Sequence, residues 1–400
     1  MSNSENTFGG YMRIEDIMFS LLRSEIGADE VDLTTFGKLS HELYAQLYVL
    51  SKKHDLSHLI ASALSRMEML GEDEVSQKFN KQLMVALYRD GQQEYALDHL
   101  STVLERAKIP HIMLKGAVVR NFYPQSWLRT SCDIDVLVRG GDVAIAMEAL
   151  RHAGYSRTED CSTHDYNFIS PNQVHVELHY TLTHDGKLAL ADRMLEAVWD
   201  RYAVPHAEGS YQYDMKPEAF ILYHISHMGR HLVDGGCGIR PFIDLWLIEK
   251  NMPFDKDQLR LLLERAGLLT FYEAVTKLRD VWLSGDQHDE GTRNLEAFIL
   301  TGGAYGTVNN AAKVNVARGS GKIRSFFSIM FLPKKNLQVI YPILVKYPIL
   351  LPFYQVKRWF NVFRKRKREK VKQIVGLHGD VTQSEADSAK GLLQSLGLQQ

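Results

Sequence analysis

The 400-residue chain has few of the features that mark secreted or nucleic-acid-binding proteins. It contains three cysteines, Cys132, Cys161 and Cys237, which are far apart and have no metal-binding spacing. They predict a reducing compartment rather than a disulfide framework. The first residues lack a basic stretch followed by an apolar one, which argues against a signal peptide. The net charge is −1 with both signs interspersed, which argues against a dedicated nucleic-acid binder. A cytoplasmic protein is the expectation.

Long uninterrupted apolar runs are also missing. The most apolar stretch, residues 325–356, is broken repeatedly by Pro333, Pro342, Pro348, Pro352, Lys334, Lys335 and Lys346. A membrane-spanning helix needs about twenty consecutive apolar residues, so this stretch is not expected to span a bilayer. The chain does have 45% apolar residues, enough for a substantial core. A length of 400 residues indicates roughly two to three domains.

The most informative stretch is residues 109–138. Its first apolar run, 109–114, predicts a strand that ends at Lys115 and Gly116. A helix is predicted next, over 117–122, ending before Tyr123-Pro124. Since glycine has no side chain, backbone at Gly116 can approach a phosphate group closely.

A second strand is predicted at 132–138, and it carries two acidic residues. Side chains alternate along a strand, so Asp133 and Asp135 share one face while Ile134 and Val136 face the core. Two neighbouring carboxylates repel each other, and removing one is expected to stabilise the metal-free protein. A divalent cation resolves the repulsion, and oxygen ligands suit Mg²⁺. The pattern therefore predicts a metal site for a nucleoside triphosphate.

These residues resemble the nucleotidyltransferases of the polymerase-β-like superfamily, and within it a bacterial group that carries Leu-Lys-Gly. The matching residues are Leu114-Lys115-Gly116, Tyr123-Pro124, Arg129, and Asp133-Ile134-Asp135 through Val138. The resemblance implies an α+β fold, with a small mixed-sheet core flanked by N-terminal and C-terminal helical regions. It also implies Mg²⁺-dependent transfer of a nucleoside monophosphate from a nucleoside triphosphate to a hydroxyl acceptor, releasing pyrophosphate. Surface-polysaccharide and natural-product pathways are the expected settings.

A third carboxylate is predicted on a hairpin with strands at 166–170 and 174–182. His175, Glu177 and His179 alternate along the second strand and share a face. The resembled group carries its third carboxylate, usually Asp, at the position of Glu177, within an acidic–apolar–His signature. The alternative is a half-exposed strand whose polar residues face water.

Three histidines follow on one predicted helix. His224, His227 and His231 are spaced at i, i+3 and i+7, which places them on one helical face. The resembled group carries a histidine pair followed by an arginine and an aspartate, which His227, His231, Arg240 and Asp244 match. A role near the active site, packing in the core, and an independent metal site are all compatible with this spacing.

The resemblance assigns roles to these positions. Asp133, Asp135 and Glu177 are the expected catalytic residues and ligands of two Mg²⁺ ions, and Glu177 is also a candidate general base. The expected nucleotide-binding and acceptor-binding residues are Lys115, Gly116, Arg129, His179, His227, His231, Arg240 and Asp244.

The rest of the chain is predicted to be mostly helical. The expected regions are a disordered 1–10, a helical 11–106, a nucleotidyltransferase core at 107–200, a helical 201–300 with the histidines, C-terminal helices with a basic segment at 301–375, and a polar tail at 376–400. Nothing in 11–106 looks catalytic, so a scaffold or lid is expected there. The glycine-rich residues 301–306 lack a preceding strand and a following Gly-Lys-Ser/Thr, so they predict a loop rather than a phosphate-binding motif.

Residues 357–372 form a strongly basic segment. They contain nine basic residues and one acidic residue, interleaved with Trp359, Phe360 and Phe363. This combination suits an interfacial helix on an anionic membrane or contact with a nucleic-acid backbone. A solvated C-terminal helix fits equally well.

Two other functions compete with nucleotidyl transfer. One is a metal-dependent phosphohydrolase built on His224, His227, His231 and Asp234. The other is a catalytically silent nucleotide-binding or assembly protein. The intact pair of Asp133 and Asp135 argues against the silent protein.

Overall fold

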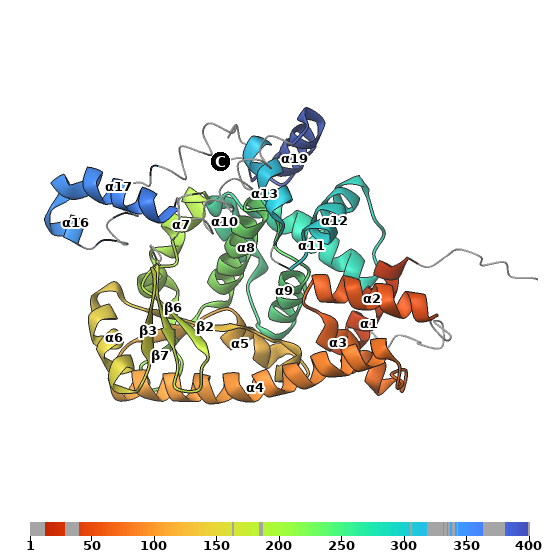
Figure 1. The fold of residues 1–400 in the computed structure, drawn as a ribbon, viewed down its shortest axis with the longest axis horizontal. Helices are drawn as coiled ribbons and strands as arrows, with labels where there is room; N and C mark the ends of the chain where they lie inside the picture. Colours follow the sequence, from red (N-terminus) through yellow and green to blue (C-terminus); the bar gives the residue numbers. More distant parts are fainter. Residues whose placement is uncertain are drawn as a thin grey trace, which may run out of the picture.

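The computed structural model describes residues 13–28, 40–161, 164–183, 187–304, 306–317, 331, 334, 337, 341, 343–362 and 381–398. The prediction of disorder at 1–10 lies outside these residues, as do residues 363–372 of the basic segment. A mixed sheet occupies one half of the molecule, and helices surround it (Figure 1). This is the α+β architecture expected from the sequence.

The N-terminal region is helical, as predicted. It contains α1 (Ile14–Ile26), α2 (His41–Lys53), α3 (Ser57–Arg66) and α4 (Glu74–Arg106). The side chain of Asp73 caps α4 by accepting hydrogen bonds from the backbone N–H groups of Val75 and Ser76. The 33 residues of α4 run along the base of the molecule, below both the N-terminal helices and the sheet (Figure 1).

The sheet has seven strands in the order β3-β4-β5-β2-β1-β7-β6. Their bounds are β1 His111–Met113, β2 Asp133–Val138, β3 Ser156–Cys161, β4 Asp165–Ile169, β5 His175–His179, β6 Ala203–Pro205 and β7 Gln212–Met215. Strand β2 lies between β5, with which it is parallel, and β1, with which it is antiparallel. The connection from β1 to β2 contains α5 (Gly116–Val119) and two 3₁₀ turns, Arg120–Phe122 and Ser126–Leu128.

Each face of β2 contacts a different core. Ile134, Val136 and Val138 pack with residues of α4 and of α6 (Val143–His152), on one side of the sheet. Leu137 faces the other side and belongs to the larger core, which includes the N-terminal helices and α8 (Pro217–Val233). Because side chains alternate along a strand, Asp133 and Asp135 point toward this second side.

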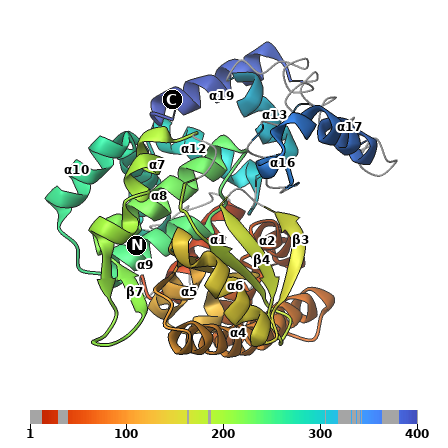
Figure 2. The same cartoon turned by 90° about the vertical axis from the view of Figure 1, so that its left-hand side faces the viewer.

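The remaining helices cover that second side and continue to the C-terminal part (Figures 1 and 2). They are α7 (Ala189–Leu195), α9 (Arg240–Asn251), α10 (Lys256–Ala266), α11 (Leu269–Ser284), α12 (Glu290–Gly302), α13 (Val308–Ala317), α16 (Ile343–Lys346), α17 (Leu351–Val362) and α19 (Gln383–Ser395). Short turns complete the secondary structure: 3₁₀ at Gly140–Asp142 and Pro348–Leu350, and π-helical at Val198–Tyr202. No helix in the described part of the chain has the length and apolarity needed to cross a membrane.

Three strands were not predicted from the sequence. Strand β3 is polar and lies at an edge of the sheet, where charged residues discourage pairing with other chains. Strands β6 and β7 are short, and they extend the sheet into residues 203–215, which the sequence pattern had placed in a helical region. Such short or polar strands lack the apolar alternation by which strands are recognised.

Glycines at the end of α12 and just after it form a packing contact. Gly306 has a φ of +73°, and a Cβ there would lie 2.6 Å from the carbonyl carbon of Gly235. Gly238, with a φ of +67°, contacts the backbone of Ala304 in the same way. The loop between α8 and α9 thus lies backbone against backbone on Gly302, Ala304 and Gly306. The prediction of a loop is confirmed at Gly303, Ala304 and Gly306, whereas Thr301 and Gly302 belong to the last turn of α12.

Candidate active site

Asp135 and Glu177 lie side by side on neighbouring strands. The parallel register of β2 and β5 pairs Asp133 with His175, Asp135 with Glu177, and Leu137 with His179. Residues paired in this way point to the same face of a sheet. The prediction that Glu177 lies on a strand is therefore confirmed, and that strand is adjacent to the strand of the aspartates. Carboxylates from two strands meet on the face that α8 covers.

Asp135 is neutralised by two cationic groups. The Lys115 Nζ donates to Asp135 Oδ1 at 2.6 Å, and the His179 Nε2 lies 2.9 Å from the same oxygen. Both contacts use Oδ1, and Oδ2 receives no hydrogen bond from the described residues. The His179 Nε2 is also 3.3 Å from Glu177 Oε2. Asp135 thus keeps one carboxylate oxygen for a further ligand.

These contacts fix the charges of the cluster. Burial would raise the pKa of Asp135, but the Lys115 charge and the His179 hydrogen bond hold it far below its usual value. Burial lowers the pKa of His179, but its hydrogen bonds to Asp135 and Glu177 outweigh this effect and raise that pKa to about 8. At neutral pH the cluster therefore contains an ionised Asp135 beside two positive groups.

Lys115 has an unusual backbone conformation, with φ 44° and ψ −122°. This region is sparsely populated by residues other than glycine and costs about 1–3 kcal/mol. The Leu114 N–H donates to the Asp135 carbonyl at 3.0 Å, which ties the turn to β2. The strained backbone directs the Lys115 side chain onto Asp135.

Asp133 has a different environment from Asp135. It is half-buried, and its Oδ1 accepts a hydrogen bond of 2.9 Å from the Ser131 hydroxyl. Ser131 also lies against the turn, because a Cβ on Gly116 would be 3.5 Å from its hydroxyl oxygen. Ser131 was not recognised in the sequence, although it directly precedes the Cys-Asp-Ile-Asp strand.

Helix α8 places aromatic side chains over this cluster. The Nε2 atoms of His227 and His231 are 2.9 Å apart, so one ring donates to the other. Burial lowers the pKa of both rings, and the Lys115 charge lowers each further. Burial also raises the pKa of Tyr223, which feels the charges of Lys115 and Asp135. The structure thus brings His227 and His231 to the carboxylates, together with Tyr223, which was not predicted.

The other predicted site residues form a separate cluster. The Arg129 guanidinium donates to both carboxylate oxygens of Asp244, with Nε–Oδ1 and Nη2–Oδ2 distances of 2.8 Å. The Tyr123 hydroxyl donates to Asp244 Oδ1, also at 2.8 Å. Burial would raise the pKa of Asp244, but Arg129 holds it below its usual value. Arg129 Nη1 would lie 3.6 Å from a Cβ on Gly116, so this pair supports the turn.

Arg240 and His224 connect α9 to its neighbours. The Arg240 Nη2 donates to Asp55 Oδ2 at 2.6 Å and to the Asp55 carbonyl at 2.7 Å. The His224 Nε2 lies 2.8 Å from the Pro241 carbonyl oxygen and donates to it. We refer to Arg129, Asp244, Tyr123, Arg240 and Asp55 together as the brace.

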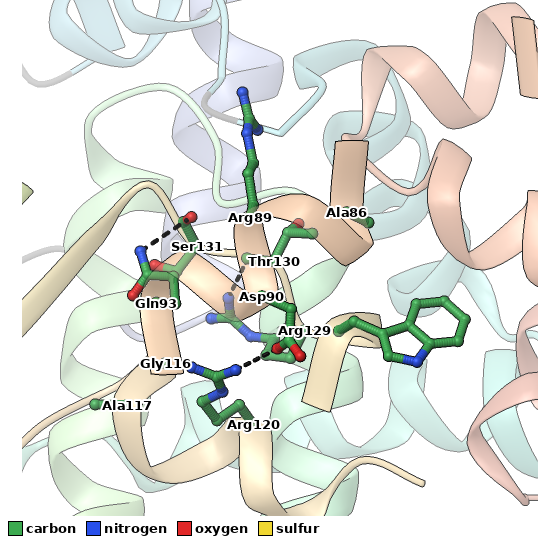
Figure 3. A pocket seen from close by; sticks show the side chains of 11 residues that line it. Ala86, Arg89, Asp90, Gln93, Gly116, Ala117, Arg120, Arg129, Thr130 and Ser131 are labelled. Atoms are coloured by element: carbon green, nitrogen blue, oxygen red, sulfur yellow. Dashed lines mark hydrogen bonds and ion pairs between the residues drawn. The ribbon is translucent and has the colours of Figure 1, made fainter. Parts of the chain in front are cut away.

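Helix α4 also contributes to the site. Figure 3 shows a narrow pocket between α4, which supplies Arg89, Asp90 and Gln93, and the turn at Gly116. Asp90 forms an ion pair with Arg120, and it accepts a hydrogen bond of 3.0 Å from the Ser126 hydroxyl. The Gln93 amide donates to the Ser131 carbonyl at 3.4 Å. The sequence predicted a scaffold or lid here. In the structure α4 contacts the segment between β1 and β2 at its 3₁₀ turns, through Asp90, and just before β2, through Gln93.

Two groups of side chains in the described residues have the geometry to hold a metal ion. Asp135, Glu177 and His179 offer ligand atoms within 4.8 Å of one another, and so do His164, Asp165 and His179. Neither of these groups includes His224, His227 or His231. Asp234, the carboxylate of the phosphohydrolase alternative, pairs with Lys187 at 2.5 Å. The described residues therefore give no support to that alternative.

The mixed sheet presents carboxylates from two parallel strands beside a glycine turn and a lysine, and one of its side-chain groups has the geometry to hold a metal ion. The chain matches the family described as uncharacterised nucleotidyltransferase over residues 42–284, more than half its length. It therefore belongs to this nucleotidyltransferase family, which supports nucleotidyl transfer as the general reaction. Comparisons with curated proteins and with solved structures found no match.

Proposed function

We propose that this chain transfers a nucleoside monophosphate from a nucleoside triphosphate to a hydroxyl acceptor, with Mg²⁺ as cofactor. The observation that carries the proposal is the pairing of Asp135 with Glu177 across parallel strands, with Lys115 on Asp135. Family membership supports the reaction class. Acceptors in surface-polysaccharide or natural-product pathways remain part of the proposal.

The donor set fits Mg²⁺. Asp135 and Glu177 supply carboxylate oxygens, Asp135 Oδ2 receives no hydrogen bond from the described residues, and Asp133 lies two residues earlier on the same face. We assign these three residues as the ligands of two ions. When bound, Mg²⁺ offsets the charge of the triphosphate and favours ionisation of the acceptor hydroxyl.

The protein residues position the reactants and move one proton. The acceptor oxygen forms a bond to the α-phosphorus, and the bond to the oxygen that bridges to the β-phosphorus breaks. Pyrophosphate leaves with that electron pair. The acceptor proton passes to the Glu177 carboxylate, which is more exposed than Asp135. Most of the rate acceleration then comes from positioning and from fixed charges.

Lys115 supplies the main fixed positive charge from the protein. In the structure its ammonium group contacts Asp135. With the metal ions held by the carboxylates, the Lys115 ammonium would donate to a phosphate oxygen of the substrate, which lies beside Gly116 in this proposal. His179 contacts Asp135, and His227 and His231 lie close enough to Lys115 for its charge to act on them. We assign these three histidines to binding of the nucleotide or acceptor.

The brace acts on substrate through the backbone. Arg129 and Asp244 hold residues 126–133, which lead into β2, and Arg129 lies against Gly116. We assign these residues, with Arg240, to positioning the phosphate-binding turn. Peripheral association with an anionic membrane through residues 357–372 is a further part of the proposal, since it would place the enzyme beside lipid-linked acceptors.

A nucleotide screen tests the activity. Thermal unfolding is measured with each nucleoside triphosphate, with and without Mg²⁺, for the wild type, Asp135→Asn and the exposed-residue control Asp98→Ala. We expect stabilisation that requires both Mg²⁺ and nucleotide, is lost in Asp135→Asn and is kept in the control. Equal stabilisation of Asp135→Asn contradicts the assignment of the site. Binding without pyrophosphate release across a panel of sugar and peptide hydroxyls favours the silent binding protein.

A further inference from the structure

An apolar surface lies on α16, α17 and the 3₁₀ turn that joins them. Its large side chains are exposed by 44% at Ile343, 48% at Tyr347, 87% at Ile349, 64% at Phe353 and 41% at Val356. The exposure of Ile349 is the highest among the large apolar side chains that the structure describes. We call these five residues the apolar tip. Monomeric soluble proteins rarely expose such a cluster without a function.

The apolar tip projects from the body of the protein. Both views show α17 at the periphery, away from α4 and from the N-terminal helices (Figures 1 and 2). Among the described elements, α16 and α17 pack mainly on the turn between them. Phe353 and Val356 are three residues apart on α17, so they share one helical face, and Ile349 lies on the 3₁₀ turn that precedes the helix.

Positive charge flanks the apolar tip. Lys346 lies over the Tyr347 ring, with its Nζ 5.6 Å from the ring centroid. The Lys357 Nζ lies 5.4 Å from the centroid of Tyr354. Lysines that pack on tyrosines in this way can keep their charge in water while neighbouring apolar groups are buried. Tyrosine also favours the boundary between lipid and water.

The sequence around the tip contains no acidic residue. No Asp or Glu occurs between Glu296 and Glu369, whereas the same stretch contains fourteen Lys and Arg residues. A second copy of this face would carry the same sign of charge and be repelled. A nucleic acid would match the charge but leave the apolar side chains exposed to water. An anionic bilayer matches both the charge and the apolar surface.

We propose that the apolar tip inserts into the headgroup region of an anionic membrane, with Lys346 and Lys357 at its surface. This inference rests on the peripheral association proposed above and locates the inserted surface, upstream of the aromatic residues 359, 360 and 363 that sequence had indicated. The absence of a membrane-spanning helix among the described residues is compatible with insertion limited to one leaflet.

Co-sedimentation of the full chain with vesicles tests this proposal. Vesicles of phosphatidylcholine alone are compared with vesicles that also contain phosphatidylglycerol. The test variant is Ile349→Glu with Phe353→Glu. Val49→Glu with Met84→Glu is the matched control, because these apolar residues, on α2 and α4, have 67% and 64% exposure. We expect the wild type and the control to bind the anionic vesicles, and the test variant to bind about tenfold more weakly.

Other outcomes separate this inference from the earlier proposal. If the test variant binds anionic vesicles with wild-type affinity, the proposed insertion of the apolar tip is wrong. If Arg364→Glu with Lys365→Glu then abolishes binding, the protein associates with the membrane through its basic segment and not through the apolar tip. No binding of the wild type to either vesicle overturns both. Tighter binding of a single-stranded oligonucleotide than of vesicles, unchanged in the test variant, overturns the inference in favour of nucleic acid. Stabilisation by Mg²⁺ and nucleotide must be equal in the test variant and wild type, which shows that the fold and active site are intact.

Discussion

Asp135 and Asp244 are both buried aspartates neutralised by a long basic side chain, but their partners are arranged differently. Asp244 accepts hydrogen bonds on both oxygens, from the fork of Arg129 and from Tyr123. Asp135 receives Lys115 and His179 on a single oxygen. A planar guanidinium fixes geometry, whereas an ammonium group on a flexible stem can change partner.

This difference indicates that the Arg129–Asp244 pair supports the fold, whereas the Asp135 cluster is the one suited to bind a ligand. Both carboxylate oxygens of Asp244 accept hydrogen bonds, so losing a partner there would leave an unpaired charge in the apolar interior. In the Asp135 cluster, Oδ2 receives no hydrogen bond from the described residues, and Lys115 lies in a strained backbone. We therefore expect this cluster, unlike the Arg129–Asp244 pair, to exchange partners without unfolding of its surroundings. Four predictions test this contrast, from the largest expected effect to the smallest.

The largest effect is expected from Asp244→Ala. This change leaves the buried Arg129 charge and the Tyr123 hydroxyl without their shared partner. We expect a loss of about 3–5 kcal/mol in the free energy of unfolding, measured by urea denaturation. Asp98→Ala, on the exposed side of α4, serves as control and should change it by less than about 0.5 kcal/mol. A small effect of Asp244→Ala would mean that the pair does not support the fold.

Acid pH should lower the free energy of unfolding through His58, which lies next to the brace. Burial and the Arg240 charge lower the pKa of His58 to about 4, and its Nε2 lies 2.9 Å from the Leu128 carbonyl. The unfolded chain binds a proton near pH 6.5, so stability is present above that pH and is lost as pH falls toward about 4. The expected loss is about 3 kcal/mol, measured by urea denaturation at several pH values. His58→Gln, which can still donate to Leu128, should reduce this pH dependence, and an unchanged dependence would contradict the assignment.

Asp135→Asn should remove the stabilisation that Mg²⁺ and nucleotide give together. At a ligand concentration of 100 times Kd this amounts to about 2.7 kcal/mol. The metal-free variant should also be less stable than the wild type, since Lys115 and His179 lose their counter-charge. Sequence reasoning from two repelling carboxylates gave the opposite sign. Thermal unfolding of the metal-free proteins decides between them, and a more stable variant would show that repulsion dominates.

The smallest effect concerns metal binding without nucleotide. Lys115 competes with cations for Asp135, so Lys115→Met should bind Mn²⁺ more tightly, by about tenfold, as followed by electron paramagnetic resonance. The same variant should bind nucleotide more weakly, because a positive charge is gone. Lys108→Met is the matched control, since Lys108 is an exposed lysine that also has a positive φ, of 58°. Unchanged Mn²⁺ affinity would mean that Lys115 does not occupy the metal position.

The sequence predicted the strands that carry the carboxylates because the relevant signals are local, while the function of the carboxylates stays a prediction. Alternation placed Asp133 and Asp135 on one face, and the hairpin signal placed Glu177 on a strand that β2 then joins in parallel. Partners distant in the sequence could not be predicted. Nothing local to Arg129 indicates that Asp244 lies 115 residues away, and nothing in α4 indicates that Gln93 contacts Ser131.

Short elements were missed for a related reason. Strands β6 and β7 have three and four residues, which are too few to show an alternation of apolar and polar side chains. Strand β7 pairs in parallel with β1, which is about 100 residues earlier in the chain, so no local turn signal indicates it. The histidine spacing predicted that the three side chains share a helical face, but not which groups that face contacts. His224 contacts a backbone carbonyl, while His227 and His231 lie beside Lys115.

The contact between Gly235 and Gly306 has a practical consequence for protein production. The matched family region ends at residue 284, but Gly302, Ala304 and Gly306 support the loop that joins α8, with its histidines, to α9, with its brace residues. A fragment trimmed to 42–284 would leave that loop without its cover and expose its glycine backbone to water. Expression boundaries for crystallisation should therefore extend beyond α12, so that both glycine segments are in the same polypeptide.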